Sequence, residues 1–201
     1  HEAQRVLREA RVRHGAQDAI LEVGTAVERV HDLTVGETAA HSTIAQGRGL
    51  DLIAGRSVKA LSEIAHATAR DAVGSRLITA SLDRARAHLA HGDEVWIVTA
   101  SPQTFAEIVA ADLGFTGALG TLVEAKDGFA TGNLVDAPLH GRRKVGAITT
   151  LAVSKGIDLA DCSAYSDSRN DIPMLAAAGM GCGYRGKPKV KAATPCQLNY
   201  A

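Results

Sequence analysis

Three short segments of this chain carry side chains that can bind an anion or a metal ion. Thr99, Ala100 and Ser101 follow a short apolar run. Lys144 stands in a basic stretch, and residues 167–171 contain two aspartates and an asparagine. A hydroxyl group followed by backbone N–H groups that enter a helix can hold a phosphate group. The oxygen atoms of residues 167–171 suit Mg²⁺, so the segments together indicate a site for phosphate and a magnesium ion.

Each segment also has a purely structural explanation. Ser101 could cap a helix, and Lys144, next to two arginines, could be an ordinary solvated lysine. For single residues of these types the structural explanation is the commoner one. Residues 167–171 could cap a helix near Ile172 through Asn170 or Asp171. A cap needs one such residue and this loop holds three, so we favour a functional explanation there. Like charges this close repel unless a cation neutralises them.

The second half of the chain alternates between strand and helix patterns. Residues 95–100 form a continuous apolar run, which is typical of a parallel strand buried on both faces. Asp127-Gly128 is a hairpin signal between two further strand patterns. We expect helices from Ser101, over residues 144–154 and over residues 172–178, and short strands at residues 163–166 and 180–184. This order predicts an α/β fold with a Rossmann-like parallel sheet, which binds ligands at the carboxyl ends of its strands.

Residues 1–78 have a different pattern. Apolar residues recur there at helical spacing, with short glycine breaks, and no stretch shows the alternation of a strand. We therefore expect a small helical bundle in residues 1–78 and the parallel sheet in residues 79–201.

Composition excludes some functions. The chain has 201 residues, 46% of them hydrophobic, with 22 basic and 22 acidic residues, so it has no cationic excess for nucleic acid. No apolar run approaches the ~20 residues that span a membrane, and no signal peptide is visible. Cys162, Cys182 and Cys196 are too few and too scattered for a disulfide framework or a zinc site. We expect buried thiols in a reducing, cytoplasmic environment.

In order and spacing, the three segments resemble the haloacid dehalogenase superfamily, in its phosphoserine-phosphatase-like subgroup. Thr99 resembles the phosphate-binding hydroxyl of the second motif, and Lys144 the third-motif lysine that binds the phosphoryl group. Residues 167–171 resemble the fourth motif. The resemblance implies that Asp167 binds Mg²⁺ directly, that Asp171 binds it through water or orients its ligands, and that Asn170 organises the phosphate side.

The resemblance also implies a fold and an activity. The fold is a three-layer α/β core with a parallel sheet, at residues 79–201, and a helical cap at residues 1–78. The activity is Mg²⁺-dependent hydrolysis of a small phosphorylated metabolite through an aspartyl-phosphate. Phosphoserine is one candidate, although Thr99-Ala100-Ser101 departs from the subgroup's usual Ser-Gly-Gly. Arg48 and Arg56 lie in the part of the cap that grips the substrate, although surface arginines are the commoner explanation. The oligomeric state is left open.

The family's first motif, a strand followed by Asp-x-Asp, is missing from the sequence. The segments around Asp32 and Asp51 each have one aspartate and follow no strand-like run. In this fold the first-motif strand lies in the middle of the sheet, so we expect the strand and its nucleophile upstream of this chain. The alternative is a catalytically silent module that binds phosphate or a partner. A further domain beyond either end is compatible with the sequence.

Overall fold

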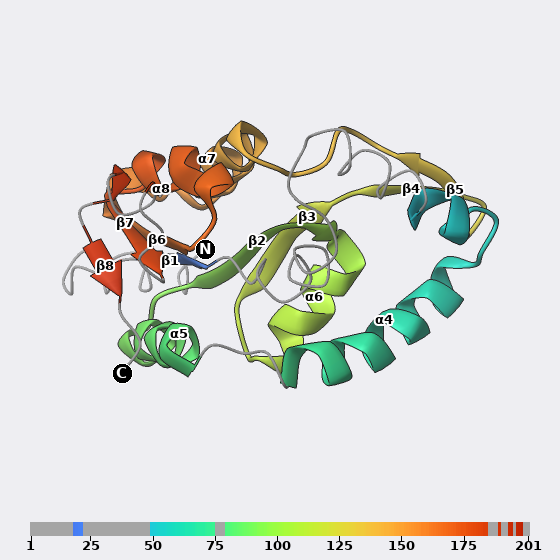
Figure 1. Cartoon of the computed structure of the whole chain (residues 1–201), viewed down its shortest axis with the longest axis horizontal. Coiled ribbons are helices and arrows are strands. Elements are labelled where there is room, and N and C mark those ends of the chain that lie inside the picture. The colour runs from blue at the N-terminus through green and yellow to red at the C-terminus, as the bar shows by residue number, and fades with distance from the viewer. Residues whose placement is uncertain are drawn as a thin grey trace, which may run out of the picture.

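The computed structural model describes residues 18–21, 49–74, 79–184, 189, 193–194 and 196–198. Its centre is a sheet of parallel strands with helices on both faces (Figure 1). The strands, in spatial order, are β3 (Gly117–Thr121), β2 (Val95–Pro102), β1 (Asp18–Leu21), β6 (Cys162–Ser166), β7 (Met180–Tyr184) and β8 (Cys196–Leu198). Every neighbouring pair in this sheet runs parallel. The predicted Rossmann-like architecture is confirmed.

Strand β1 corrects two predictions. No strand was expected in residues 1–78, and the central strand was expected upstream of the chain. Instead Asp18–Leu21 pairs with β2 on one side and with β6 on the other. The strand is only four residues long, so it offers too short a pattern to show alternation, and its pairing on both edges supplies the backbone hydrogen bonds. These residues therefore form part of the parallel sheet.

Helices α7 (Arg142–Lys155) and α8 (Ile172–Ala177) lie on one face of the sheet. Helices α5 (Thr79–His91) and α6 (Gln103–Asp112) lie on the other (Figure 1). Strand β2 contacts the helices on both faces of the sheet. Val98 packs with Ile148 of α7, whereas Ile97 packs with residues of α6. Both side chains are buried, which confirms the prediction of a strand covered on both faces.

A long helix and a hairpin extend beside the core. Helix α4 (Val58–Gly74) lies alongside α6, and the hairpin of β4 (Val123–Lys126) and β5 (Phe129–Leu134) forms a separate sheet. The hairpin prediction at Asp127-Gly128 is confirmed, since both residues have positive φ, 52° and 84°.

The hairpin is joined by its backbone to the residues that precede α4. Gly55 donates to the carbonyl of Ala130 over 2.8 Å, and the Ala130 N–H donates to Arg56 over 2.9 Å. The hairpin is thus attached to the segment predicted as cap. The division of the chain into cap and core at residue 78 stays a prediction.

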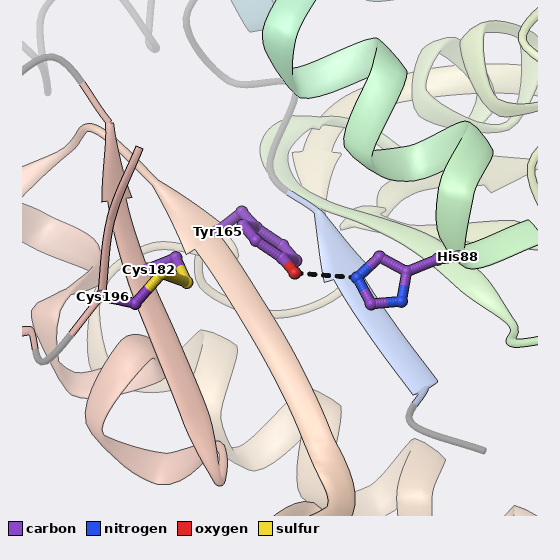
Figure 2. The surroundings of a disulfide bond; sticks show 4 residues. All are labelled: His88, Tyr165, Cys182 and Cys196. Carbon is purple, nitrogen blue, oxygen red and sulfur yellow. Dashed lines mark hydrogen bonds between the residues drawn. A yellow bond between two sulfur atoms is a disulfide. The ribbon is translucent and has the colours of Figure 1, made fainter. Parts of the chain in front are cut away.

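The cysteines depart from the prediction. Cys162 is a buried thiol, as expected, but Cys182 and Cys196 form a disulfide between β7 and β8 (Figure 2). These two residues are register partners in adjacent strands, a proximity that their spacing in sequence does not reveal. Because disulfides are rare in reducing compartments, the cysteines no longer support a cytoplasmic location, which stays a prediction. Among the described residues, no helix has the length and apolar character needed to cross a membrane.

Candidate phosphate and metal site

Lys144 and Asp171 form a buried ion pair at the edge of the sheet. Lys144 lies in the first turn of α7, and its Nζ atom is 2.8 Å from Asp171 Oδ1. Each residue is only 1% exposed. Lys144 is therefore not the solvated surface lysine of the structural explanation. Burying two charges costs several kcal/mol per ion unless they are paired and hydrogen-bonded. The pair therefore requires further hydrogen-bond donors to the Asp171 carboxylate.

The end of β6 and the loop after it supply these hydrogen bonds. Ser166, the last residue of β6, donates from Oγ to the second Asp171 oxygen over 2.8 Å. The N–H of Ser168 donates to Ser166 Oγ over 3.0 Å. Asp167 stands between Ser166 and Ser168 in the sequence, and its side chain is buried at the carboxyl end of β6. Two carboxylates are thus buried within five residues of each other.

Helix capping does not explain this loop. Ser168 caps the short 3-10 turn at Arg169–Asp171, where its side chain accepts from the Asn170 N–H over 3.3 Å. Asp171 occupies the N-cap position of α8 but makes no side-chain cap bond. Its carboxylate is directed to Lys144 and Ser166 instead. Asn170 is half-buried.

The donor set of this loop fits Mg²⁺. Asp167 and Asp171 present hard oxygen donors, and Mg²⁺ is usually held by one or two carboxylates together with water and substrate phosphates. The described residues contain no group of three or more His, Cys, Asp or Glu placed to hold a metal ion. Mg²⁺ bound here would therefore take its remaining ligands from water, from the substrate or from residues outside the described ranges.

Thr99, Ala100 and Ser101 stand at the carboxyl end of β2. Thr99 is buried, and the Ser101 N–H donates to Thr99 Oγ1 over 3.1 Å. The Thr99 hydroxyl donates in turn to Ser101 Oγ over 3.2 Å. The prediction that a helix begins at Ser101 is wrong. Strand β2 continues to Pro102, and α6 begins at Gln103 with no side-chain cap. Ser101 therefore does not cap this helix, and both hydroxyl groups remain at the edge of the sheet.

The predicted residues fall into two groups. Lys144 and Asp171 touch each other at the end of β6, and Thr99 and Ser101 touch each other at the end of β2. The two strands are separated only by β1, so both groups lie at the same edge of the sheet.

Two further predictions concern the cap and the first motif. Arg48 lies outside the described residues. Arg56 is exposed, and its Nε donates to the Leu52 carbonyl over 2.9 Å, which is a local helix contact. Asp51 is exposed in the helical residues 49–53, in agreement with its rejection as a first motif. The segment around Asp32 lies outside the described residues.

The sequence alone missed Ser166, and the only signal was a hydroxyl residue at the end of a predicted strand. It also missed a polar network on the α5 side of β6. His88 Nδ1 lies 2.7 Å from Asp93 Oδ2, and His88 Nε2 lies 2.8 Å from the Tyr165 hydroxyl (Figure 2). Burial raises the pKa of Tyr165 above its usual value, so its hydroxyl stays neutral.

Known proteins resemble this chain in sequence. The haloacid dehalogenase-like hydrolase family matches residues 4–176. A phosphoserine phosphatase of Mycobacterium tuberculosis is 41% identical over 138 residues, which make up 68% of this chain and 45% of that protein. The chain thus spans about half the length of the curated relatives it matches.

Solved structures resemble it in fold. A protein of unknown function from Bordetella pertussis Tohama I has a TM-score of 0.70 at 23% identity, and the match covers 87% of this chain and 92% of that one. A substrate-bound phosphoserine phosphatase has a TM-score of 0.62 at 16% identity, with 90% and 92% covered. At these identities the structures show the fold alone. The family match extends over most of the chain, from before β1 to α8, and the chain belongs to the haloacid dehalogenase-like hydrolases.

Proposed function

We propose that this chain belongs to an Mg²⁺-dependent phosphatase that hydrolyses a small phosphorylated metabolite. The observation that carries the proposal is the buried Lys144–Asp171 ion pair, held by Ser166 beside Asp167 at the carboxyl end of β6. Ligands of open α/β sheets bind at such strand ends, and membership of a hydrolase family agrees with this chemistry.

The residues at this edge have complementary roles in the proposal. Lys144 and the hydroxyl groups of Thr99 and Ser101 bind the phosphoryl oxygens, assisted by the backbone N–H groups that lead into α6. Asp167 would hold Mg²⁺ directly, and Asp171, whose oxygens contact Lys144 and Ser166, would hold it through water or orient its ligands. The bound ion would supply positive charge to the phosphoryl group. Each well-placed group of this kind is worth ~3 kcal/mol in the transition state.

The attacking carboxylate is the open element of the proposal. An upstream strand is not needed, because β1 fills the place between β2 and β6. The residue that follows β1 in the sequence is Glu22, the first acidic residue after the strand, and Gly24 stands where an Asp-x-Asp pair would have its second acid. Glu22 lies outside the described residues. We propose it as the carboxylate to test.

The sequence that follows β1 favours a second candidate function. A chain whose central strand leads to Glu22 and not to Asp-x-Asp lacks the family's usual nucleophile and its general acid and base. It would then be a silent module that binds phosphate or a partner through Lys144 and Thr99. The buried charges weigh against this candidate, because they are costly to retain without use.

Release of inorganic phosphate by the full-length protein separates the candidates. A phosphatase releases phosphate from a panel of phosphorylated metabolites with Mg²⁺, and Asp167→Ala abolishes the release. Glu22→Gln abolishes it too if Glu22 attacks phosphorus. Phosphate binding without any release supports the silent module. Full activity in Asp167→Ala would contradict the metal assignment.

The substrate is a separate proposal. Curated relatives of this chain, among them the one from Mycobacterium tuberculosis, bear the name phosphoserine phosphatase. Phosphoserine is therefore the first compound of the panel, with other small phosphomonoesters beside it. The proposed partner is this small substrate, without nucleic acid.

A further inference from the structure

The loop that would bind phosphate is a bulge in the β2–β3 ladder. Val98 pairs with Leu119, and the next pair is Pro102 with Thr121, so β2 advances by four residues while β3 advances by two. The additional residues on β2 lie in the Thr99-Ala100-Ser101 segment. A bulge frees backbone groups from the ladder and redirects the chain. The freed groups near a buried edge then need other partners.

Gln103 and Thr121 provide those partners. The Gly120 N–H donates to Gln103 Oε1 over 2.5 Å, and Gln103 Nε2 donates to the Ala118 carbonyl over 3.0 Å. The side-chain amide of Gln103 thus takes the place of a missing backbone amide opposite β3. The Thr121 hydroxyl donates to the carbonyl of Ala100, in the middle of the bulge, over 2.7 Å.

Thr121 also connects the bulge with the approach to Lys144. Its Oγ1 accepts from the Leu139 N–H over 3.0 Å. Leu139 lies two residues before Gly141, the N-cap of α7, and Lys144 lies in the first turn of that helix. One buried hydroxyl therefore joins the segment that carries Thr99 to the segment that carries Lys144.

Gly120 shows how closely the bulge lies against β3. A Cβ atom at Gly120 would be 2.8 Å from Ser101 O and 2.8 Å from Gln103 Cα, both backbone atoms. Such contacts require the backbone to shift, so a residue with a side chain would push Ser101 away from β3.

We propose that Thr121 and Gln103 are positioning residues of the phosphate-binding site, which set the bulge of Thr99-Ala100-Ser101 and its register to Lys144. The proposal rests on the proposed function, since it assigns the phosphate to this loop. It goes further in naming residues that do not touch the phosphate. Displacement of a binding group by ~1 Å can cost ~100-fold in rate, so these bonds act on binding and turnover through Thr99 and Ser101.

The test uses isosteric variants of the full-length protein and inorganic phosphate as the probe, with Mg²⁺ present. Thr121→Val removes both hydrogen bonds and keeps the shape. We expect its dissociation constant for phosphate to rise about tenfold. Thr121→Ser keeps the hydroxyl, so its affinity stays within about twofold of wild type. Calorimetric titration measures both.

The same strand pair offers a matched control. Thr116 Oγ1 accepts from the Val95 N–H over 2.9 Å, at the opposite end of β2 and β3. Thr116→Val removes a strand-tying bond of the same kind away from the site, so it lowers the melting temperature without weakening phosphate binding. If Thr121→Val does not fold, Gln103→Met tests the same proposal at a second, partly exposed position. We expect it to lose as much phosphate affinity as Thr121→Val.

Three outcomes are decisive. Loss of affinity in Thr121→Val or Gln103→Met, with rescue in Thr121→Ser and none in Thr116→Val, supports the positioning role. Wild-type affinity in both site variants, or an equal loss in Thr116→Val, overturns it and leaves the proposed function intact. Wild-type protein that binds no phosphate overturns the proposed function and the positioning role together.

Discussion

Two buried polar clusters meet at neighbouring residues of β6 and differ in what they can do. The first, the site cluster, consists of Lys144, Ser166, Asp167 and Asp171. The second, the His88 cluster, consists of His88, Asp93 and Tyr165. Their shortest contacts are alike, 2.8 Å from Lys144 to Asp171 and 2.7 Å from His88 to Asp93. Burial and short hydrogen bonds alone therefore do not distinguish a site from a structural network.

Position and charge do distinguish them. The His88 cluster joins α5 and the turn before β2 to one face of β6. Tyr165 packs there in an apolar group with Val95 and Cys182, and Figure 2 shows Tyr165 between His88 and the disulfide. The site cluster lies at the carboxyl ends of the strands and places two carboxylates on one loop. A structural network has no need for a second buried carboxylate, because each such charge is costly to desolvate. We infer that the first cluster binds a ligand and that the second stabilises the fold.

The largest expected effect comes from Asp167. Asp167→Asn keeps the size of the side chain and removes its charge, so a metal ion loses an anionic ligand. We expect phosphate release to fall by about three orders of magnitude with little change in melting temperature. Initial rates at saturating Mg²⁺, with circular dichroism on the same samples, measure this. An active Asp167→Asn protein would place the chemistry elsewhere.

Lys144 is expected to affect both activity and stability. Lys144→Met leaves the Asp171 carboxylate buried without its cation, which costs about 3 kcal/mol in unfolding free energy, and lowers phosphate release about 100-fold. The double variant Lys144→Met/Asp171→Leu removes both charges. We expect it to regain stability in urea unfolding while it stays inactive. If the double variant also recovered activity, the pair would be structural like the His88 cluster.

His88 is expected to affect stability alone. His88→Leu leaves Asp93 and the Tyr165 hydroxyl each without one buried partner, which costs about 2 kcal/mol. We expect the turnover number to stay within about twofold of wild type, because the hydrogen bonds described for His88 join it to Asp93 and Tyr165 and not to the site cluster. Urea unfolding and steady-state kinetics on one preparation compare the two effects. A loss of turnover as large as that of Lys144→Met would remove the distinction between the clusters.

The smallest effect is expected at the exposed pair of Asp136, in the segment before α7, with Arg143, the neighbour of Lys144 in α7. The pKa of Asp136 is lowered because the Ala137 N–H and the Arg143 guanidinium both donate to its carboxylate. A lowered folded-state pKa stabilises the protein above the ordinary aspartate range, and this contribution is lost as pH falls through the lowered value. Melting temperatures of wild type and Asp136→Asn should therefore differ slightly at neutral pH and converge in acid.

A gap between those two melting curves that widened in acid would contradict the sign of this effect. A gap as large as that of Lys144→Met would contradict the view that exposed pairs contribute little.

The sequence predicted the elements whose patterns are long and local. The apolar run in β2, the Asp127-Gly128 hairpin and the helix that carries Lys144 were all recognisable, and so were the acidic loop and its order relative to Thr99. These features depend on residues close in the chain. They were sufficient to predict the sheet and the edge at which the candidate site lies.

Features that depend on long-range pairing were missed. Strand β1 has four residues and is defined by its two neighbours in the sheet. The disulfide of Cys182 and Cys196 needs β7 and β8 to be adjacent in register. The His88–Tyr165 contact joins residues 77 positions apart. No local pattern encodes such contacts, because they arise from strand order.

The most direct test of the central claim is the Mg²⁺ dependence of phosphate release by the full-length wild-type protein. The protein is stripped of metal with a chelator, assayed on a panel of phosphomonoesters headed by phosphoserine, and assayed again after Mg²⁺ is restored. The account predicts no release without metal and recovery with Mg²⁺, because Asp167 and Asp171 present the ligands that this ion prefers. Undiminished release in the chelator would contradict it.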